Sequence, residues 1–294
     1  MRLHLILWTL IASLALSLSL SAQRANGLRF ANQEDYVQIE KASIQLLKNV
    51  PSEFDLSKWF PKPGDQGSQA SCVGWALAYG LKSYQEARRL QRPPTEQDHV
   101  FSPAFIYNQI SDNCYSGSNL REALELMRRS GVAPMTSFPY DDEDCSKIPG
   151  NSIKVEAKAY VIGGWKRVEY RNEGQMKTFL VHGKPVVVGL ETDTWFDNLS
   201  DGEVYRVSSN RYTGGHAVVV IGYDDRRGAY KILNSWGEDW GENGYGWIAY
   251  ELFEKVVHEA YIVEDADVDR RPSKKHKKGG KPIDVGYIPE ESKI

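Results

Sequence analysis

Cys72 lies in the stretch DQGSQASCVGWALAYG, between a polar run rich in glycine and serine and apolar residues at helical spacing. The pattern predicts a helix that begins at the cysteine. The unpaired N–H groups and the dipole of a helix N-terminus lower the pKa of a thiol. Cys72 is therefore a candidate nucleophile, and its alternatives are a buried structural cysteine or one half of a disulfide.

A nucleophilic cysteine needs a base, and the chain has six histidines. Five of them lie in an apolar N-terminal segment, at a predicted helix end, in a basic tail, or in segments without other catalytic features: His4, His182, His276, His99 and His258. The sixth, His216, lies in GGHAVVVIGYDD at the start of a predicted strand. We select His216 as the candidate base.

A predicted hairpin joins His216 to an amide side chain. Strands over 216–223 and 229–234 flank the turn-forming residues 224–228, and pairing them about Asp225 places His216 opposite Asn234. Opposed side chains lie close enough for the asparagine to orient the imidazole, although a bulge would change this register. The alternative is an ordinary strand histidine beside a turn-forming asparagine.

Gln66 precedes Cys72 by six residues, in a loop that must turn back at Gly67 to reach the helix. Its amide and the backbone N–H of Cys72 could together hold a developing oxyanion. The alternative is a polar loop residue without a chemical role. We expect neither a metal ion nor a cofactor.

The N-terminal segment predicts export. Residues 1–22 combine a basic start, an apolar run and small residues, which is typical of a secretory signal peptide, with a retained anchor as the alternative. We expect no membrane span in the mature chain and a secreted or periplasmic location. Disulfides persist there, so an odd number of cysteines leaves one thiol over. A disulfide between Cys114 and Cys145 would leave Cys72 free.

Composition and hydrophobic pattern divide the chain after the N-terminal segment into a leader, a main domain and a tail. Its 294 residues are 41% hydrophobic and 26% charged with a net charge of −3, which argues against disorder and against a nucleic-acid partner. Residues 23–50 form a short leader with a weak helix around 35–48, and 51–265 form the main domain. Residues 266–294 form a basic tail, interpreted as disordered, with binding to anionic surfaces as the alternative.

Periodicity predicts an α+β fold with two lobes and a cleft between them. Helices are expected in WALAYGLKSYQEARRL after Cys72, in SPAFIYNQI and in SNLREALELMRRSG, where Ser118 or Asn119 can cap and Gly131 can terminate. From Val155 onward, short antiparallel strands are expected in a set of β-rich runs, interrupted by the helix EGQMKTFLVHG: VEAKAYVIGG, PVVVGLET, GEVYRV, HAVVVIGYD, AYKILNSWG, GYGWIAY and EAYIVED.

These residues also resemble a known family. DQGSQASC, GGHAV and NSWG followed by WGENGYGW are similar, in the same order, to the three signature blocks of the papain-like cysteine peptidases, over about Pro51 to Asp265. The resemblance implies a helical left lobe, an antiparallel β-barrel-like right lobe, and peptidase activity in the cleft between them, acting on peptides or proteins through a thioester acyl-enzyme. A monomer is expected.

By position, the resemblance gives Cys72 the role of nucleophile, His216 that of base, Asn234 that of its orienting residue and Gln66 that of oxyanion-hole glutamine. Trp236 matches the tryptophan that covers the His–Asn pair. The substrate groove would include Gly215, and Gly117 in the CYSGSN segment that resembles the family's glycine-rich loop.

The chain also departs from the family pattern. Gln69 replaces a usual cysteine, and Val73 replaces an aromatic residue, which would alter the groove wall. The leader is too short for the family's long inhibitory propeptide, so latency is expected to come from elsewhere. Two other functions use the same groove: a catalytically silent peptide-binding protein, and an acyl transferase with an amine acceptor.

Overall fold

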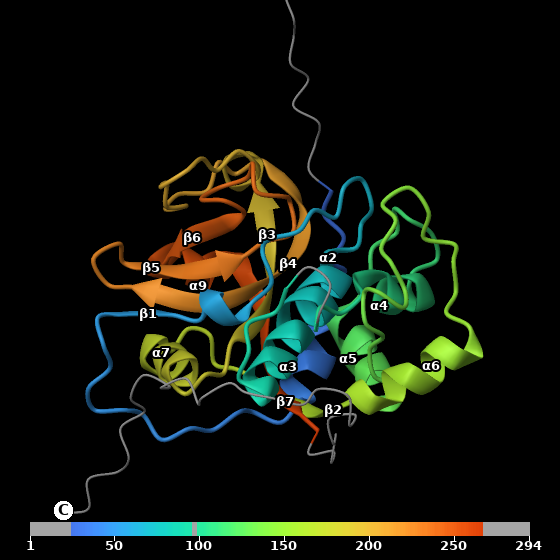
Figure 1. The fold of residues 1–294 in the computed structure, drawn as a ribbon. Coiled ribbons are helices and arrows are strands. Elements are labelled where there is room, and N and C mark those ends of the chain that lie inside the picture. The colour runs from blue at the N-terminus through green and yellow to red at the C-terminus, as the bar shows by residue number, and fades with distance from the viewer. Residues whose placement is uncertain (1–24, 96–98, 267–294) are drawn as a thin grey trace, which may run out of the picture.

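The computed structural model describes residues 25–95 and 99–266 of the chain. Most helices gather on one side of the molecule and most of the sheet lies on the other (Figure 1). The proposed signal peptide and all but the first residue of the proposed basic tail lie outside the described residues. The two expected lobes are present, and their helical and β-rich halves follow each other along the chain as predicted.

One long helical segment begins at Cys72 and forms the centre of the helical lobe. It consists of α2 (Cys72–Gly74), η2 (Trp75–Lys82) with wider π-type turns, and α3 (Ser83–Leu90). It ends where Gln91 adopts a left-handed conformation, before Pro93 and Pro94. Around it lie α4 (Pro103–Ile110), α5 (Leu120–Ser130), α6 (Asn151–Ala157) and the short turns η1 (Ser57–Trp59) and η3 (Lys158–Tyr160).

Local sequence explains where these helices start and stop. Ser102 accepts a hydrogen bond from the backbone N–H of Phe105 at the start of α4, and Asn119 accepts one from Arg121 at the start of α5. Gly131 ends α5 with a φ of 74°, in the left-handed region that favours glycine. Of the two predicted capping residues, Ser118 and Asn119, it is therefore Asn119 that caps α5.

The second lobe is an antiparallel sheet with the order β2-β7-β3-β4-β5-β6, in which β1 pairs with β4. The strands are β1 (Glu53–Asp55), β2 (Ile162–Arg167), β3 (Val186–Asp193), β4 (Tyr212–Asp224), β5 (Ala229–Leu233), β6 (Tyr245–Ala249) and β7 (Val257–Asp265). The accompanying helices are α7 (Glu173–Val181), α8 (Thr194–Asp197) and α9 (Tyr250–Val256). Because β2 and β6 are the two ends of this order, the sheet is open, and the expectation of a barrel-like lobe is corrected to an open, seven-stranded sheet.

Three predicted elements differ from the structure. The first half of VEAKAYVIGG is helical, because its lysine, glutamate and alanine favour a helix and Val155 faces solvent. GEVYRV forms only an isolated bridge between Tyr205 and Ile248. The leader helix α1 (Gln33–Gln38) starts at the cap Asn32 and ends early, because the chain then runs beside β2, where the N–H of Ala42 donates to the carbonyl of Arg167.

The helix that begins at Cys72 packs directly against the sheet. A Cβ on Gly80 would lie 3.2 Å from Cγ2 of Val219 in β4, and α2 also contacts β4. Gly74 lies against the backbone of Pro103 at the start of α4, where a Cβ would come within 2.6 Å of the carbonyl oxygen. The start of the helix is therefore fixed between α4 and β4, with Cys72 at the junction of the lobes.

Candidate active site

Cys72 is fully buried at the N-terminus of α2 and has a neutral thiol at neutral pH. Burial raises its pKa to about 12, and nearby backbone groups of Ala217 and Val73 offset this only in part. The backbone groups at the helix N-terminus therefore lower this pKa by less than burial raises it, because the cost of burying the charged form is larger. The contact with Ala217 also places the sulfur beside the residue that follows His216.

His216 and Asn234 form a direct hydrogen bond. Nε2 of His216 donates to Oδ1 of Asn234 over 2.7 Å, and the same oxygen accepts from the backbone N–H of Ser235 over 2.8 Å. Nδ1 of His216 has no hydrogen-bond partner among the described residues. Burial lowers the pKa of His216 to about 4, so the ring is neutral, with a proton on Nε2 and a free lone pair on Nδ1.

The predicted register of the hairpin is wrong, although the contact it was meant to explain exists. Val219 pairs with Leu233 and Val220 with Ile232, and the register shifts at the irregularity before Gly222. If the register of the Val219–Leu233 pair is continued by one residue, Val218 stands opposite Asn234, in place of the predicted His216. The error is two residues, so His216 and Asn234 stay on one face as diagonal neighbours, within reach of each other's side chains.

Aromatic rings cover this pair. The ring centroids of His216 and Trp236 lie 4.4 Å apart at an interplanar angle of 31°. Phe196 of α8 packs edge-on against Trp236, with a centroid distance of 5.5 Å, and its ring lies 6.4 Å from that of His216. Phe196 was not predicted as a site residue, because nothing in its own segment distinguishes it from an ordinary core residue.

Gln66 is fully buried and its amide is held at both ends. Oε1 accepts from the hydroxyl of Ser235 over 2.6 Å, while Nε2 donates to the carbonyl of Gln69 over 2.8 Å and to that of Ala25 over 3.0 Å. Ser235, which was also not predicted as a site residue, therefore links Gln66 to Asn234. Because Oε1 is occupied by a donor, Nε2 is the end that faces the cleft.

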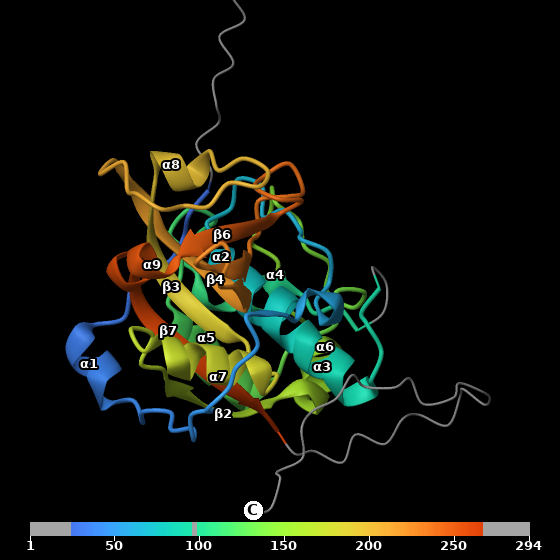
Figure 2. The same ribbon diagram turned by 90° about the vertical axis from the view of Figure 1, so that its left-hand side faces the viewer.

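The leader occupies the cleft. The N–H groups of Gly27 and Leu28 both donate to the carbonyl of Gly215, over 3.1 and 2.9 Å. Ser118 donates to the carbonyl of Gly27 over 2.7 Å, and Arg29 donates to the carbonyl of Ser118 over 2.8 Å. The leader is thus an extended strand between β4 and the loop before α5, and its α1 continues beside β7 (Figure 2).

Both glycines selected for the groove contact this strand. A Cβ on Gly117, which has a φ of +67°, would lie 2.4 Å from the carbonyl oxygen of Gly27. A Cβ on Gly215 would lie 2.4 Å from that of Leu28. Close backbone approach therefore requires glycine at both positions. The carbonyl of Ala25 also accepts from the indole N–H of Trp236, over 3.0 Å, so it receives two donors from the site.

The short leader was not expected to cover the site, but its extended residues between Ala25 and Ala31 lie across the cleft. The side chains of Cys72 and His216 have no exposed surface. In this state the cleft is closed.

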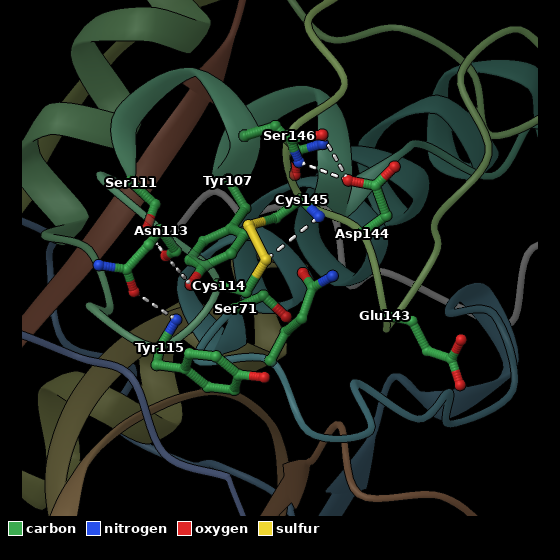
Figure 3. Close-up of a disulfide and its surroundings, with 12 residues drawn as sticks. Ser71, Tyr107, Ser111, Asn113, Cys114, Tyr115, Glu143, Asp144, Cys145 and Ser146 are labelled. Atoms are coloured by element: carbon green, nitrogen blue, oxygen red, sulfur yellow. Dashed lines mark hydrogen bonds between the residues drawn. A yellow bond between two sulfur atoms is a disulfide. The ribbon is translucent and has the colours of Figure 1, made fainter.

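A disulfide joins Cys114 to Cys145, as predicted, and Cys72 is the free cysteine. Figure 3 shows the bridge near Ser71, the residue before Cys72. The carbonyl of Cys114 accepts from the N–H of Ala70, so the bridged loop supports the approach to α2. Gln69 holds the same region from the other side, because its Nε2 donates to the carbonyl of Asp141 over 2.5 Å. Val73 packs into the hydrophobic core.

Comparison with known proteins agrees with this fold. Residues 50–263 match the family model described as papain family cysteine protease. The chain is 27% identical over 237 residues to a cysteine protease of Blomia tropicalis, covering 76% of this chain and 68% of the relative. It is 25% identical over 236 residues to cathepsin K of Mus musculus, covering 77% and 68%.

Among solved structures, xylellain, a cysteine protease from Xylella fastidiosa, superimposes with a TM-score of 0.70 at 26% identity, covering 83% of this chain and 97% of that one. The two-lobed fold is that of a cysteine protease. This chain belongs to the papain family. Within residues 25–95 and 99–266, no helix has both the length and the apolar character needed to cross a membrane.

Proposed function

We propose that this chain is an exported peptidase that hydrolyses peptide bonds through Cys72, His216 and Asn234, and that it is made in a latent form. The observation that carries the proposal is the state of the His216 ring. Asn234 holds Nε2, while the lone pair of Nδ1 has no partner in the described part of the chain, and the ring adjoins the residue that contacts the Cys72 sulfur. A ring in that state is ready to accept a proton from a thiol.

Each step of the reaction has a group to perform it. Nδ1 of His216 takes the thiol proton as the sulfur bonds to the substrate carbonyl carbon. The carbonyl oxygen becomes an oxyanion, which accepts from Nε2 of Gln66 and the backbone N–H of Cys72. His216 returns the proton to the leaving nitrogen as the C–N bond breaks, and a thioester remains. Water, deprotonated by His216, then attacks the thioester and releases the acid as the sulfur recovers a proton.

The leader must be displaced before this sequence begins. It occupies the donors that a substrate would need, because the carbonyl of Ala25 accepts from Gln66 and that of Gly27 from Ser118. Displacement would also end the burial that keeps both Cys72 and His216 neutral. A thiolate–imidazolium pair could then form.

The N-terminal pattern of residues 1–22 and the disulfide support export to an oxidising compartment. We propose that the exported chain acts as a monomer on peptides or proteins.

The test uses the purified chain, a peptidyl epoxide and a peptide substrate. Cys72 is the one free cysteine of the three, so alkylation by the epoxide reports on it directly. We expect labelling of Cys72 together with peptide hydrolysis, and loss of both in Cys72→Ala. Full hydrolysis by Cys72→Ala would refute the assignment of the nucleophile. Binding of peptide without cleavage would indicate the silent binding protein, and transfer of the acyl group to an added amine in place of water would indicate the transferase.

A further inference from the structure

Both ends of the loop that leads to Cys72 bond to one side chain. The hydroxyl of Tyr140 donates to the backbone carbonyl of Gln66 over 2.7 Å and lies 2.7 Å from the hydroxyl of Ser71. Because the single proton of the Tyr140 hydroxyl is used on Gln66, the Ser71 hydroxyl donates the second hydrogen bond. Burial raises the pKa of Tyr140 to about 12, so the phenol keeps its proton at neutral pH.

Ser71 makes this contact in place of a local one. It stands at the N-cap position of α2, where a serine side chain usually accepts from the first turn, but among the described residues its hydroxyl forms no capping hydrogen bond. The side chain is fully buried and bonds to Tyr140. A cap contributes typically about 1 kcal/mol, and local preferences of this kind are given up most often at functional sites.

The segment that carries Tyr140 also supports the middle of the loop. Nε2 of Gln69 donates to the carbonyl of Asp141. Gly67 turns directly on the next residue, since its φ is +58° and a Cβ there would lie 2.3 Å from Oδ2 of Asp142. The bonds from Tyr140 are therefore part of a continuous contact between the segment and the loop.

The two residues that Tyr140 joins carry or adjoin the two proposed oxyanion donors. Nε2 is the end of the Gln66 side chain, and the N–H of Cys72 belongs to the peptide group that begins at Ser71. Ser235 ties Gln66 to the β-rich lobe, because its carbonyl accepts from the backbone N–H over 2.9 Å and its hydroxyl donates to Oε1 over 2.6 Å. Tyr140 ties Gln66 to the start of α2.

An oxyanion must lie about 2.7–3.1 Å from each donor, so the separation of the two donors decides whether one oxygen can accept from both. We infer that Tyr140 is a positioning residue for the oxyanion hole, and that its hydroxyl sets the separation between Nε2 of Gln66 and the N–H of Cys72. This inference rests on the proposed peptidase activity and adds a residue to its site.

The first experiment adds Tyr140→Phe to the full chain carrying Gly27→Ala, in which the new Cβ meets the backbone of Ala70 and loosens the leader. We expect kcat for peptide hydrolysis to fall about tenfold with KM nearly unchanged, because the ring stays and only its hydrogen bonds are lost. Epoxide labelling of Cys72 should change less than about twofold, because an epoxide opens at a saturated carbon and forms no carbonyl oxyanion.

The matched control is Tyr79→Phe in the same chain. The hydroxyl of Tyr79 donates to the carbonyl of Lys62 over 2.8 Å, and its ring packs against Trp75, as does that of Tyr140. The control therefore removes a tyrosine–carbonyl hydrogen bond from similar surroundings and should leave kcat unchanged. An equal loss of kcat in both variants would show that Tyr140 contributes only to general stability.

A double-mutant cycle tests whether Tyr140 acts through Gln66. Once Gln66→Ala has removed one donor, the separation of the donors no longer matters, so adding Tyr140→Phe should change kcat less than about twofold. The inference is overturned if Tyr140→Phe alone leaves kcat as it was, if it slows labelling as much as hydrolysis, or if its full effect persists beside Gln66→Ala.

A Gly27→Ala chain that cleaves no peptide would instead count against the proposed peptidase activity. NMR of the natural chain then decides the inference, since it needs no turnover. The signals of the Gln66 side-chain amide and of the Cys72 backbone amide should both shift in Tyr140→Phe, and neither should shift in Tyr79→Phe. Two unchanged signals in Tyr140→Phe would overturn the inference.

Discussion

Gly27 of the leader lies directly on the backbone of Ala70, two residues before Cys72, where a Cβ would come within 2.0 Å of the carbonyl oxygen and 2.7 Å of Cα. Gly27→Ala should therefore displace the leader, because overpacking of this kind costs about 1–3 kcal/mol. We expect epoxide labelling of Cys72 to accelerate by about tenfold or more, which corresponds to at least about 1.4 kcal/mol.

The matched control is Gly164→Ala on β2, where a Cβ would meet no atom within 4 Å. It should label at the rate of the natural chain. Equal labelling rates for Gly27→Ala and the natural chain would show that the leader does not limit access to Cys72.

His216 makes the closed protein less stable in acid. Its pKa in the fold is about 4, below the ordinary value of 6.5, so the unfolded chain binds a proton that the fold does not. Stability must therefore fall as the pH falls from about 6.5 to about 4, by up to about 3 kcal/mol for this group. Urea unfolding of the natural chain and of His216→Asn, compared at pH 7 and pH 4, should show this loss in the natural chain alone. An equal loss in both would contradict the expectation.

Asn234→Ala removes the group that holds Nε2 of His216. In the Gly27→Ala chain, we expect kcat for peptide hydrolysis to fall about 10- to 100-fold through misplacement of the ring, with KM nearly unchanged. Asn198→Ala, at an exposed position, is the control. A rise in KM at constant kcat would instead indicate that Asn234 binds substrate.

Gln66→Ala should have two effects of opposite sign. The leader loses the hydrogen bond from Nε2 to the carbonyl of Ala25, so labelling of Cys72 should be faster. Peptide hydrolysis should be about 100-fold slower, because one donor to the oxyanion is removed. Both rates are measured on one preparation, so misfolding, which would alter both in the same direction, is distinguished. Undiminished hydrolysis would exclude the oxyanion role.

Lys82 is a buried cation whose Nζ lies 2.5 Å from Asp265, at the end of β7. Asp265→Asn removes this carboxylate from the buried charge and should lower the free energy of unfolding by about 3 kcal/mol. Denaturant titration against Glu264→Gln, the exposed neighbour, measures the difference. A loss equal to that of the control would show that Gln85 and the carbonyl of Val161, which also accept from Lys82, compensate for the missing carboxylate.

Local pattern was enough to predict the helix at Cys72, the capped helix at Asn119 and most of the strands. It was also enough to bring His216 and Asn234 together, because a register error of two residues keeps a side chain on its face of the sheet. Three features depend on contacts between distant parts of the chain. Ser235 acts through Gln66, 169 residues earlier, Phe196 acts through Trp236, and the pKa of Cys72 depends on its burial at the junction of the two lobes.

The leader is part of the chain that it covers, and ion pairs such as Lys41–Glu169 and Glu40–Lys166 hold it outside the cleft as well. Its effective concentration at Cys72 is therefore set by the length of the connecting chain and not by the amount of protein in solution. Diluting the protein cannot open the cleft, and opening is a first-order event in each molecule. Only a cut between the leader and Glu53 of β1 would turn release into a dissociation that depends on concentration.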